Sequence, residues 1–183
     1  MRMRMLDRSG VSRSLLFALT GILWLVSWVV PPSFEMAPSM AKWLVVLLFS
    51  ASLVSLAGAL LVFGRMVGRP QVVRLATLAG ALAGLCSGAN IFEDGFQIEW
   101  FFFVFVLGLL ILDVALLALT IVIARTAPDR YRLLAVIPAG TLAGILLGAA
   151  VTGPIMLLTW LTAAVVALKV PAPLTPVSGA DTA

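Results

Sequence analysis

The sequence has no histidine and a single cysteine, and only 11% of its 183 residues are charged. The absence of histidine excludes a histidine-ligated haem, a zinc site of the usual ligand set and a Ser-His-Asp triad. The cysteine, Cys86, lies in an apolar segment and cannot form an intramolecular disulfide, so we interpret it as a small packing residue. No glycine loop is followed by Lys-Ser or Lys-Thr, as a phosphate-binding loop requires. We therefore expect neither enzyme activity nor a bound cofactor or metal.

Apolar residues, by contrast, make up 62% of the chain, and the mean hydropathy is +1.17. These values are far outside the range of soluble domains, and a helix needs only about 20 apolar residues to cross a bilayer. The sequence therefore predicts an all-α integral membrane protein. Its expected domains are a basic N-terminus (1–13), a bundle of six transmembrane helices (14–169) and a disordered tail (170–183). The expected spans are 14–31, 42–64, 72–90, 100–124, 133–151 and 154–169.

The boundary between the last two spans and the length of the third span are set by short sequence features. Gly153 and Pro154 are expected to form a tight turn between the last two helices, because 133–170 is too long for one span. The third span has an uninterrupted apolar part only from Leu75 to Ala89, which would cover about 22 Å. A re-entrant third segment is therefore the alternative to six full crossings.

The distribution of charge favours six crossings. In that arrangement every Lys and Arg except Lys42 falls on one side, which is the bias of cytoplasmic loops. Both termini are then cytoplasmic, whereas a re-entrant third segment would place Arg125, Arg130 and Arg132 outside. The basic N-terminus thus serves as a topology signal and leaves no basic groove for nucleic acid. A signal peptide cleaved after "SMA" (39–41) fits less well, because the cut would lie about ten residues past the apolar run.

Small residues recur at four-residue spacing in two segments, and such rows let membrane helices approach closely. The third segment has Gly80, Gly84 and Gly88, and the fifth has Gly140, Gly144 and Gly148. We expect these two helices to pack with the second helix at the centre of the bundle. A glycine-lined pore and a dimer interface are the alternatives.

One carboxylate, Asp113, lies near the middle of the apolar run "VLGLLILDVALLALTIVIA" (106–124). At 1.5 Å per residue it lies about 18 Å from the inner loop, near the bilayer midplane. An ionised carboxylate costs at least a few kcal/mol there, so Asp113 should face the bundle or keep its proton. No basic residue occurs at that depth. The expected hydrogen-bond partners are therefore on the second and third helices: Ser50, Ser52, Ser55, Cys86 and Ser87.

Asp113 belongs to a row, Glu99, Val106, Asp113 and Thr120, whose seven-residue spacing places its members on one stripe of a helix. In one interpretation Asp113 exchanges a proton in ion transport, and Glu99 gathers cations at the outer mouth. In the other, a protonated Asp113 donates a hydrogen bond and fixes the helix register, which contributes about 1 kcal/mol.

The outer loop "NIFEDGFQIEW" carries an acidic cluster, Glu93 and Asp94, close to Glu99. Carboxylates suit hard cations, and Asn90 would add a carbonyl oxygen to such a site. Gly95 is expected to make the turn that brings these acids together. The neighbouring aromatic residues equally describe a segment that rests on lipid headgroups.

The sequence thus predicts a multi-pass protein of the cell (inner) membrane, and its arginine, alanine and glycine content indicates a bacterial source. Its expected role is that of a structural or accessory membrane subunit. The alternative is a small proton- or cation-linked transporter or channel component that uses Asp113. Its expected partners are the lipid bilayer and either a membrane protein or a second copy of the chain, with no nucleic acid.

Overall fold

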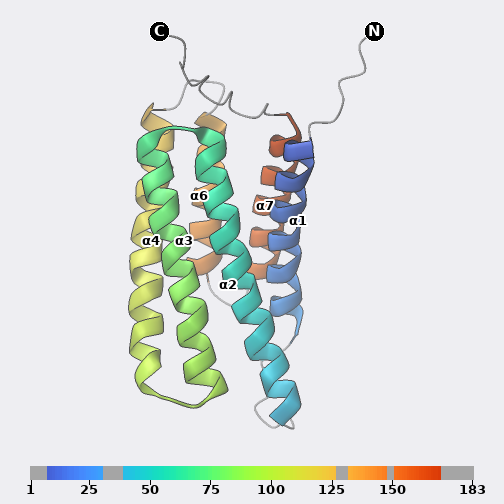
Figure 1. The fold of residues 1–183 in the computed structure, drawn as a ribbon, viewed down its shortest axis with the longest axis vertical. Helices are drawn as coiled ribbons and strands as arrows, with labels where there is room; N and C mark the ends of the chain where they lie inside the picture. Colours follow the sequence, from blue (N-terminus) through green and yellow to red (C-terminus); the bar gives the residue numbers. More distant parts are fainter. Residues whose placement is uncertain (1–7, 31–38, 127–131, 148–150, 170–183) are drawn as a thin grey trace, which may run out of the picture.

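The computed structural model describes residues 8–30, 39–126, 132–147 and 151–169, and these residues form helices joined by short connections (Figure 1). The expected tail (170–183), most of the basic N-terminus and Gly148 lie outside the described residues. The helices are α1 (Arg8–Val29), α2 (Ser39–Val67), α3 (Pro70–Asn90), α4 (Trp100–Thr126), α6 (Val136–Leu146) and α7 (Thr152–Lys169). A π-helical turn, η2 (Ile91–Gly95), extends α3, and a 3₁₀ turn, η3 (Leu133–Ala135), precedes α6.

Five of the described helices are long and apolar enough to span a membrane, and the helical segment Leu133–Leu146 is apolar but shorter. The all-helical fold class is therefore confirmed for the described residues, with five to six helices of membrane-spanning character. This result follows from composition, because a lipid-embedded chain must pair its backbone groups internally and helices do so within each segment.

The helices form a closed ring in chain order. α1 contacts α2, α2 contacts α3, α3 contacts α4, α4 contacts α6, α6 contacts α7, and α7 closes the ring against α1. In Figure 1 the beginning of α1, the α2–α3 turn and the end of α7 lie at the same end, and the α3–α4 connection lies at the opposite end. The fold thereby gathers Arg13, Arg65, Arg69 and Lys169 at the first end, which we call the basic end. The opposite end is called the outer end below.

The third helix is longer than its apolar core suggested. Helical structure continues from Pro70 through Gly95, 26 residues that extend about 39 Å. Hydrophobicity alone underestimates this length because the helix continues through Asn90, whose buried amide donates hydrogen bonds to Val46 O and Ser50 Oγ on α2 (3.4 and 3.0 Å). Figure 1 shows α3 running beside α2 and α4 along its length, which does not support the re-entrant alternative.

The expected turn at Gly153 and Pro154 is wrong, because both residues lie in the first turn of α7. Proline is tolerated there, since the first amides of a helix have no carbonyl partner within it. The chain reverses before Thr152, whose hydroxyl donates to Gly144 O (2.8 Å). α6 has only 11 residues, about 17 Å, and Figure 1 shows α6 and α7 ending well short of the outer ends of α2, α3 and α4.

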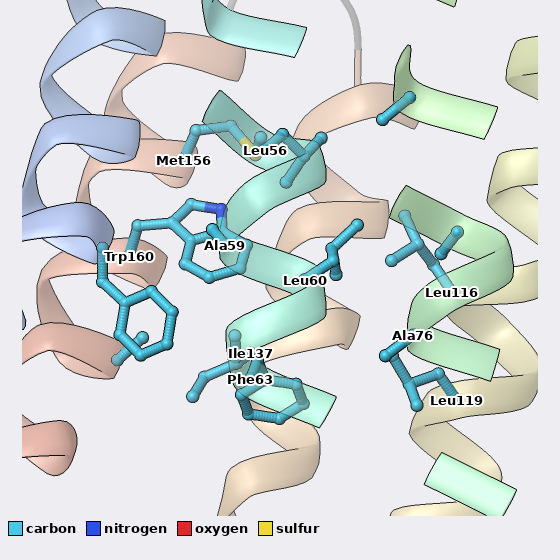
Figure 2. Packing of buried hydrophobic residues seen from close by; sticks show 14 of the residues in the cluster. Leu56, Ala59, Leu60, Phe63, Ala76, Leu116, Leu119, Ile137, Met156 and Trp160 are labelled. Atoms are coloured by element: carbon cyan, nitrogen blue, oxygen red, sulfur yellow. The ribbon is translucent and has the colours of Figure 1, made fainter. Parts of the chain in front are cut away.

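Large apolar side chains fill the centre of the ring (Figure 2). Phe17 of α1 packs against Trp160 of α7, with ring centroids 5.5 Å apart. Further side chains from α2, α4, α6 and α7 are 0–1% exposed: Leu56, Leu60, Phe63, Leu112, Leu116, Leu119, Ile137 and Met156. The interior of the described bundle is thus an apolar packed core.

Candidate functional site

Asp113 lies near the middle of α4 and is half-buried. One carboxyl oxygen, Oδ1, is fully covered and has no hydrogen-bond partner among the described residues. Removing a carboxyl oxygen from water without a hydrogen bond costs several kcal/mol in an apolar medium. Asp113 is therefore an unsatisfied polar group within the hydrophobic length of the helix.

The hydroxyl groups expected to pair with Asp113 have other partners. Ser55 Oγ donates to Thr20 Oγ1 on α1 (2.8 Å), and Ser52 Oγ donates to Leu48 O (2.9 Å). Ser50 and Ser87 bond to each other's carbonyl oxygens across the α2–α3 interface (3.4 and 3.0 Å). These side chains stabilise the contacts of α2 with its two neighbours, and among the described residues none of them bonds Asp113 Oδ1.

Helix geometry is consistent with the lack of a hydrogen bond between Asp113 and the described side chains of α3. α3 covers α4 along the side that carries Gly108, where a Cβ in place of the glycine hydrogen would lie 2.7 Å from the Cys86 sulfur. Asp113 follows Gly108 by five residues, a rotation of about 140° around the helix. The buried Cys86 thiol instead donates to Phe105 O (3.8 Å). Asp113 thus lies beside the row of α4 that packs on α3 and within electrostatic range of Cys86, but makes no hydrogen bond to it.

The seven-residue row that contains Asp113 lies at the border between the core and the outward surface of α4. Glu99 and Val106 are exposed, and Thr120 is half-buried with its hydroxyl bonded to Leu116 O of its own helix (2.8 Å). The core side of α4 carries a different set of residues: Gly108, Leu112, Ala115, Leu116, Leu119 and Ile123. The row therefore does not line a path through the centre of the bundle.

The acids of the outer loop do come together. Glu93, Asp94 and Glu99 line an open depression of about 710 Å³ at the outer end, opposite Lys42 of α2. Gln97, Phe102 and Phe103 complete its lining. Within the described part of the chain, however, no group of three or more His, Cys, Asp or Glu side chains is arranged to hold a metal ion. The depression thus combines both signs of charge with an aromatic wall.

Further aromatic rings lie at the same end of the bundle. Trp43 of α2 lies directly over Gly95, where a Cβ would come within 2.7 Å of the indole ring, and it contacts Phe96 edge to face at 5.4 Å. Trp100 is 69% exposed and Phe103 is 71% exposed. The positive φ of the connection is at Gln97 (59°), not at the expected Gly95, whose role is to admit Trp43. Exposed aromatic rings at the end of a bundle are typical of a membrane interface.

The two glycine rows have different surroundings. Gly140 contacts Thr159, and Gly144 lies against Met156 (a Cβ would be 2.9 Å from its Sδ), so the α6 row packs on α7. On α3, a Cβ on Gly80 would lie 3.0 Å from Ala57 O of α2, whereas a Cβ on Gly84 or Gly88 would meet no atom of a neighbouring described helix within 4 Å. The α3 row therefore packs at one end and is open at the other.

Sequence reasoning missed one buried polar network. Asn90, Ser50 and Ser87 are each 3% exposed and connect the outer halves of α2 and α3 through four hydrogen bonds. The sequence suggests Asn90 only as a cation ligand of the outer loop, whereas its side chain points into the α2–α3 interface. A signal for the network is present in the sequence, because Ser87 and Asn90 are three residues apart and so share a face of one helix.

Comparisons with protein-family models, with curated proteins and with solved structures gave no match.

Proposed function

We propose that this chain is a structural or accessory subunit of a bacterial inner membrane, embedded as a bundle of six helices and without enzyme activity of its own. The observation that carries this proposal is the apolar core: the side chains at the centre of the ring are large, apolar and 0–1% exposed. A conduction path needs polar groups or water along its length, and these residues supply neither. Their packing suits a subunit with a structural or accessory role in the membrane.

The orientation is part of the same proposal. The basic end of the bundle faces the cytoplasm, with both termini, and the outer end faces away from it. Two features support this orientation. Arg65, Arg69 and Arg125 are at or near helix ends on the basic end, as cytoplasmic loops require. The aromatic residues around Trp43 gather at the outer end, where they suit the opposite interface.

An ion-flux measurement tests the proposal. The purified protein is reconstituted in vesicles that contain a pH-sensitive dye, and proton and potassium gradients are applied. We expect flux equal to that of protein-free vesicles, because no polar path crosses the core. Flux above that background that disappears in the Asp113→Asn variant would refute the accessory role and establish a transport function.

The second candidate is a proton- or cation-linked carrier, and the unpartnered Oδ1 of Asp113 is the observation that favours it. In this case a hydrophobic carbodiimide should label Asp113, and a particular cation should protect it. Labelling that no cation affects would leave only the accessory role, because a cation-binding carboxyl must compete with the reagent.

A further inference from the structure

We propose that the flank of α4 around Asp113 is the docking surface for a transmembrane helix of another protein, and that this helix presents a Lys or Arg side chain to the Asp113 carboxyl. This inference rests on the proposed accessory role and names the chemistry of the partner. Two features of α4 lie side by side: the carboxyl of Asp113, whose Oδ1 has no hydrogen-bond partner among the described residues, and an apolar surface that no other described helix covers.

The carboxyl requires a donor. Acidic side chains within transmembrane segments are costly, and they are found paired or facing a wet cavity. Asp113 has neither environment in the described chain, because Oδ1 is unbonded and the adjacent core is apolar. Oδ1 is covered by the chain itself, so a cationic donor from outside the bundle would bond the other carboxyl oxygen, Oδ2, and supply the compensating charge.

The surface beside the carboxyl is uncovered. Leu110, Val114 and Leu117, which surround Asp113 on the outward side of α4, are 58%, 66% and 49% exposed. Helix α6, the neighbour of α4 in the ring, ends well short of the outer ends of α3 and α4 (Figure 1). An apolar helix can therefore lie along the outward side of α4 and reach Asp113 at its middle.

A second copy of this chain cannot supply the cation. The basic residues of the described helices lie near helix ends, and the one closest in sequence on α4, Arg125, is 12 positions away, about 18 Å along the axis. In a symmetric dimer through this surface, Asp113 would meet another acid instead of a base. Charge complementarity thus assigns the surface to a different protein.

A binding assay with model helices tests this inference. The protein with Asp113 intact carries a donor dye on a single cysteine, introduced as Gln97→Cys in a Cys86→Ala background. It is reconstituted with apolar peptides of about 22 residues that carry an acceptor dye. One peptide has a central Lys, and the matched peptide has Leu there. We expect the Lys peptide to bind about tenfold more tightly, as an interhelical contact of about 1–2 kcal/mol predicts.

Two variants assign the effect to the carboxyl. Asp113→Asn should lower the affinity for the Lys peptide to that of the Leu peptide. Asp94→Asn, which removes an exposed acid at the outer end, should leave the preference intact. Equal binding of the two peptides to the wild type would overturn the inference, and so would a Lys preference that survives Asp113→Asn. Energy transfer between labelled copies that depends on Asp113 would also overturn it, because the surface would then serve self-association.

The two proposals fail separately. Flux in peptide-free vesicles refutes the accessory role whatever the peptides do. Equal peptide binding without flux refutes only the cationic partner.

Discussion

Gly64 of α2 and Gly84 of α3 show how the surroundings of a glycine decide its role. A Cβ on Gly64 would lie 2.6 Å from the Ala76 Cβ and 3.4 Å from the Val73 Cα, so the close approach of α2 and α3 depends on its absence. Gly84 has no atom within 4 Å of the same position. The two residues therefore form a matched pair for measuring how much close packing contributes.

We expect Gly64→Ala to destabilise the bundle by about 1–3 kcal/mol, because overpacking forces a tightly packed backbone apart. Gly84→Ala should be neutral or slightly stabilising, since alanine favours a helix over glycine by up to about 1 kcal/mol. Thermal unfolding of both variants in the same detergent gives the comparison. A lower melting temperature for Gly84→Ala than for Gly64→Ala would contradict the assigned packing.

Among individual residues, the sequence located Asp113 within an apolar helix and grouped the acids of the outer loop. It could not assign their contacts. The partners expected for Asp113, among them Ser50 and Ser87, bond to each other because α2 and α3 pack through that face. Which faces of two helices meet depends on side-chain shape across the interface, and hydrophobicity along one chain does not encode it.

At the scale of elements, the α3–α4 connection combines polar residues with exposed aromatic rings. Trp100 is 69% exposed at the start of α4, whereas Trp160 of α7 is 0% exposed in the core. If the outer end of the bundle lies at the lipid headgroups, Trp100 is in contact with lipid and Trp160 is shielded from it.

Quenching by lipids brominated on the upper acyl chain distinguishes the two environments. In variants that keep one tryptophan and replace the other four by phenylalanine, we expect strong quenching for Trp100 and little for Trp160. Circular dichroism of each variant serves as the control for folding. Equal quenching of the two would show that the core is open to lipid or that the connection lies away from the interface.

The elements also show where sequence patterns lose accuracy. Each described helix lies in one of the apolar runs, because the requirement for internal hydrogen bonding leaves few alternatives in lipid. The ends were less accurate: α3 continues through Asn90 and Glu93, and α7 begins before Pro154. These ends depend on a buried side-chain network and on proline tolerance in a first helical turn, and neither changes the hydropathy of the segment.

At the scale of the whole molecule, the ring closes because α1 packs against α7, so the first and last described helices stabilise each other. A Cβ on Gly21 would lie 3.2 Å from the Leu157 backbone, and Trp28 lies over Gly153. Chain order and charge predicted antiparallel neighbours, but not this closure, which is a contact between the most distant helices in the sequence. Closure surrounds the apolar side chains of the core, and we expect the centre of the molecule to be dry.

The dryness of this centre is the central claim, and thiol accessibility measures it most directly. In a Cys86→Ala background, Leu60→Cys places a thiol in the core, and Gln97→Cys places one at the exposed outer connection. Both variants are treated in membranes with a water-soluble cationic methanethiosulfonate. We expect the Gln97→Cys variant to react and the Leu60→Cys variant to react only after denaturation in detergent. Comparable reaction rates for the two in intact membranes would show that water reaches the centre, and would contradict a packed accessory bundle.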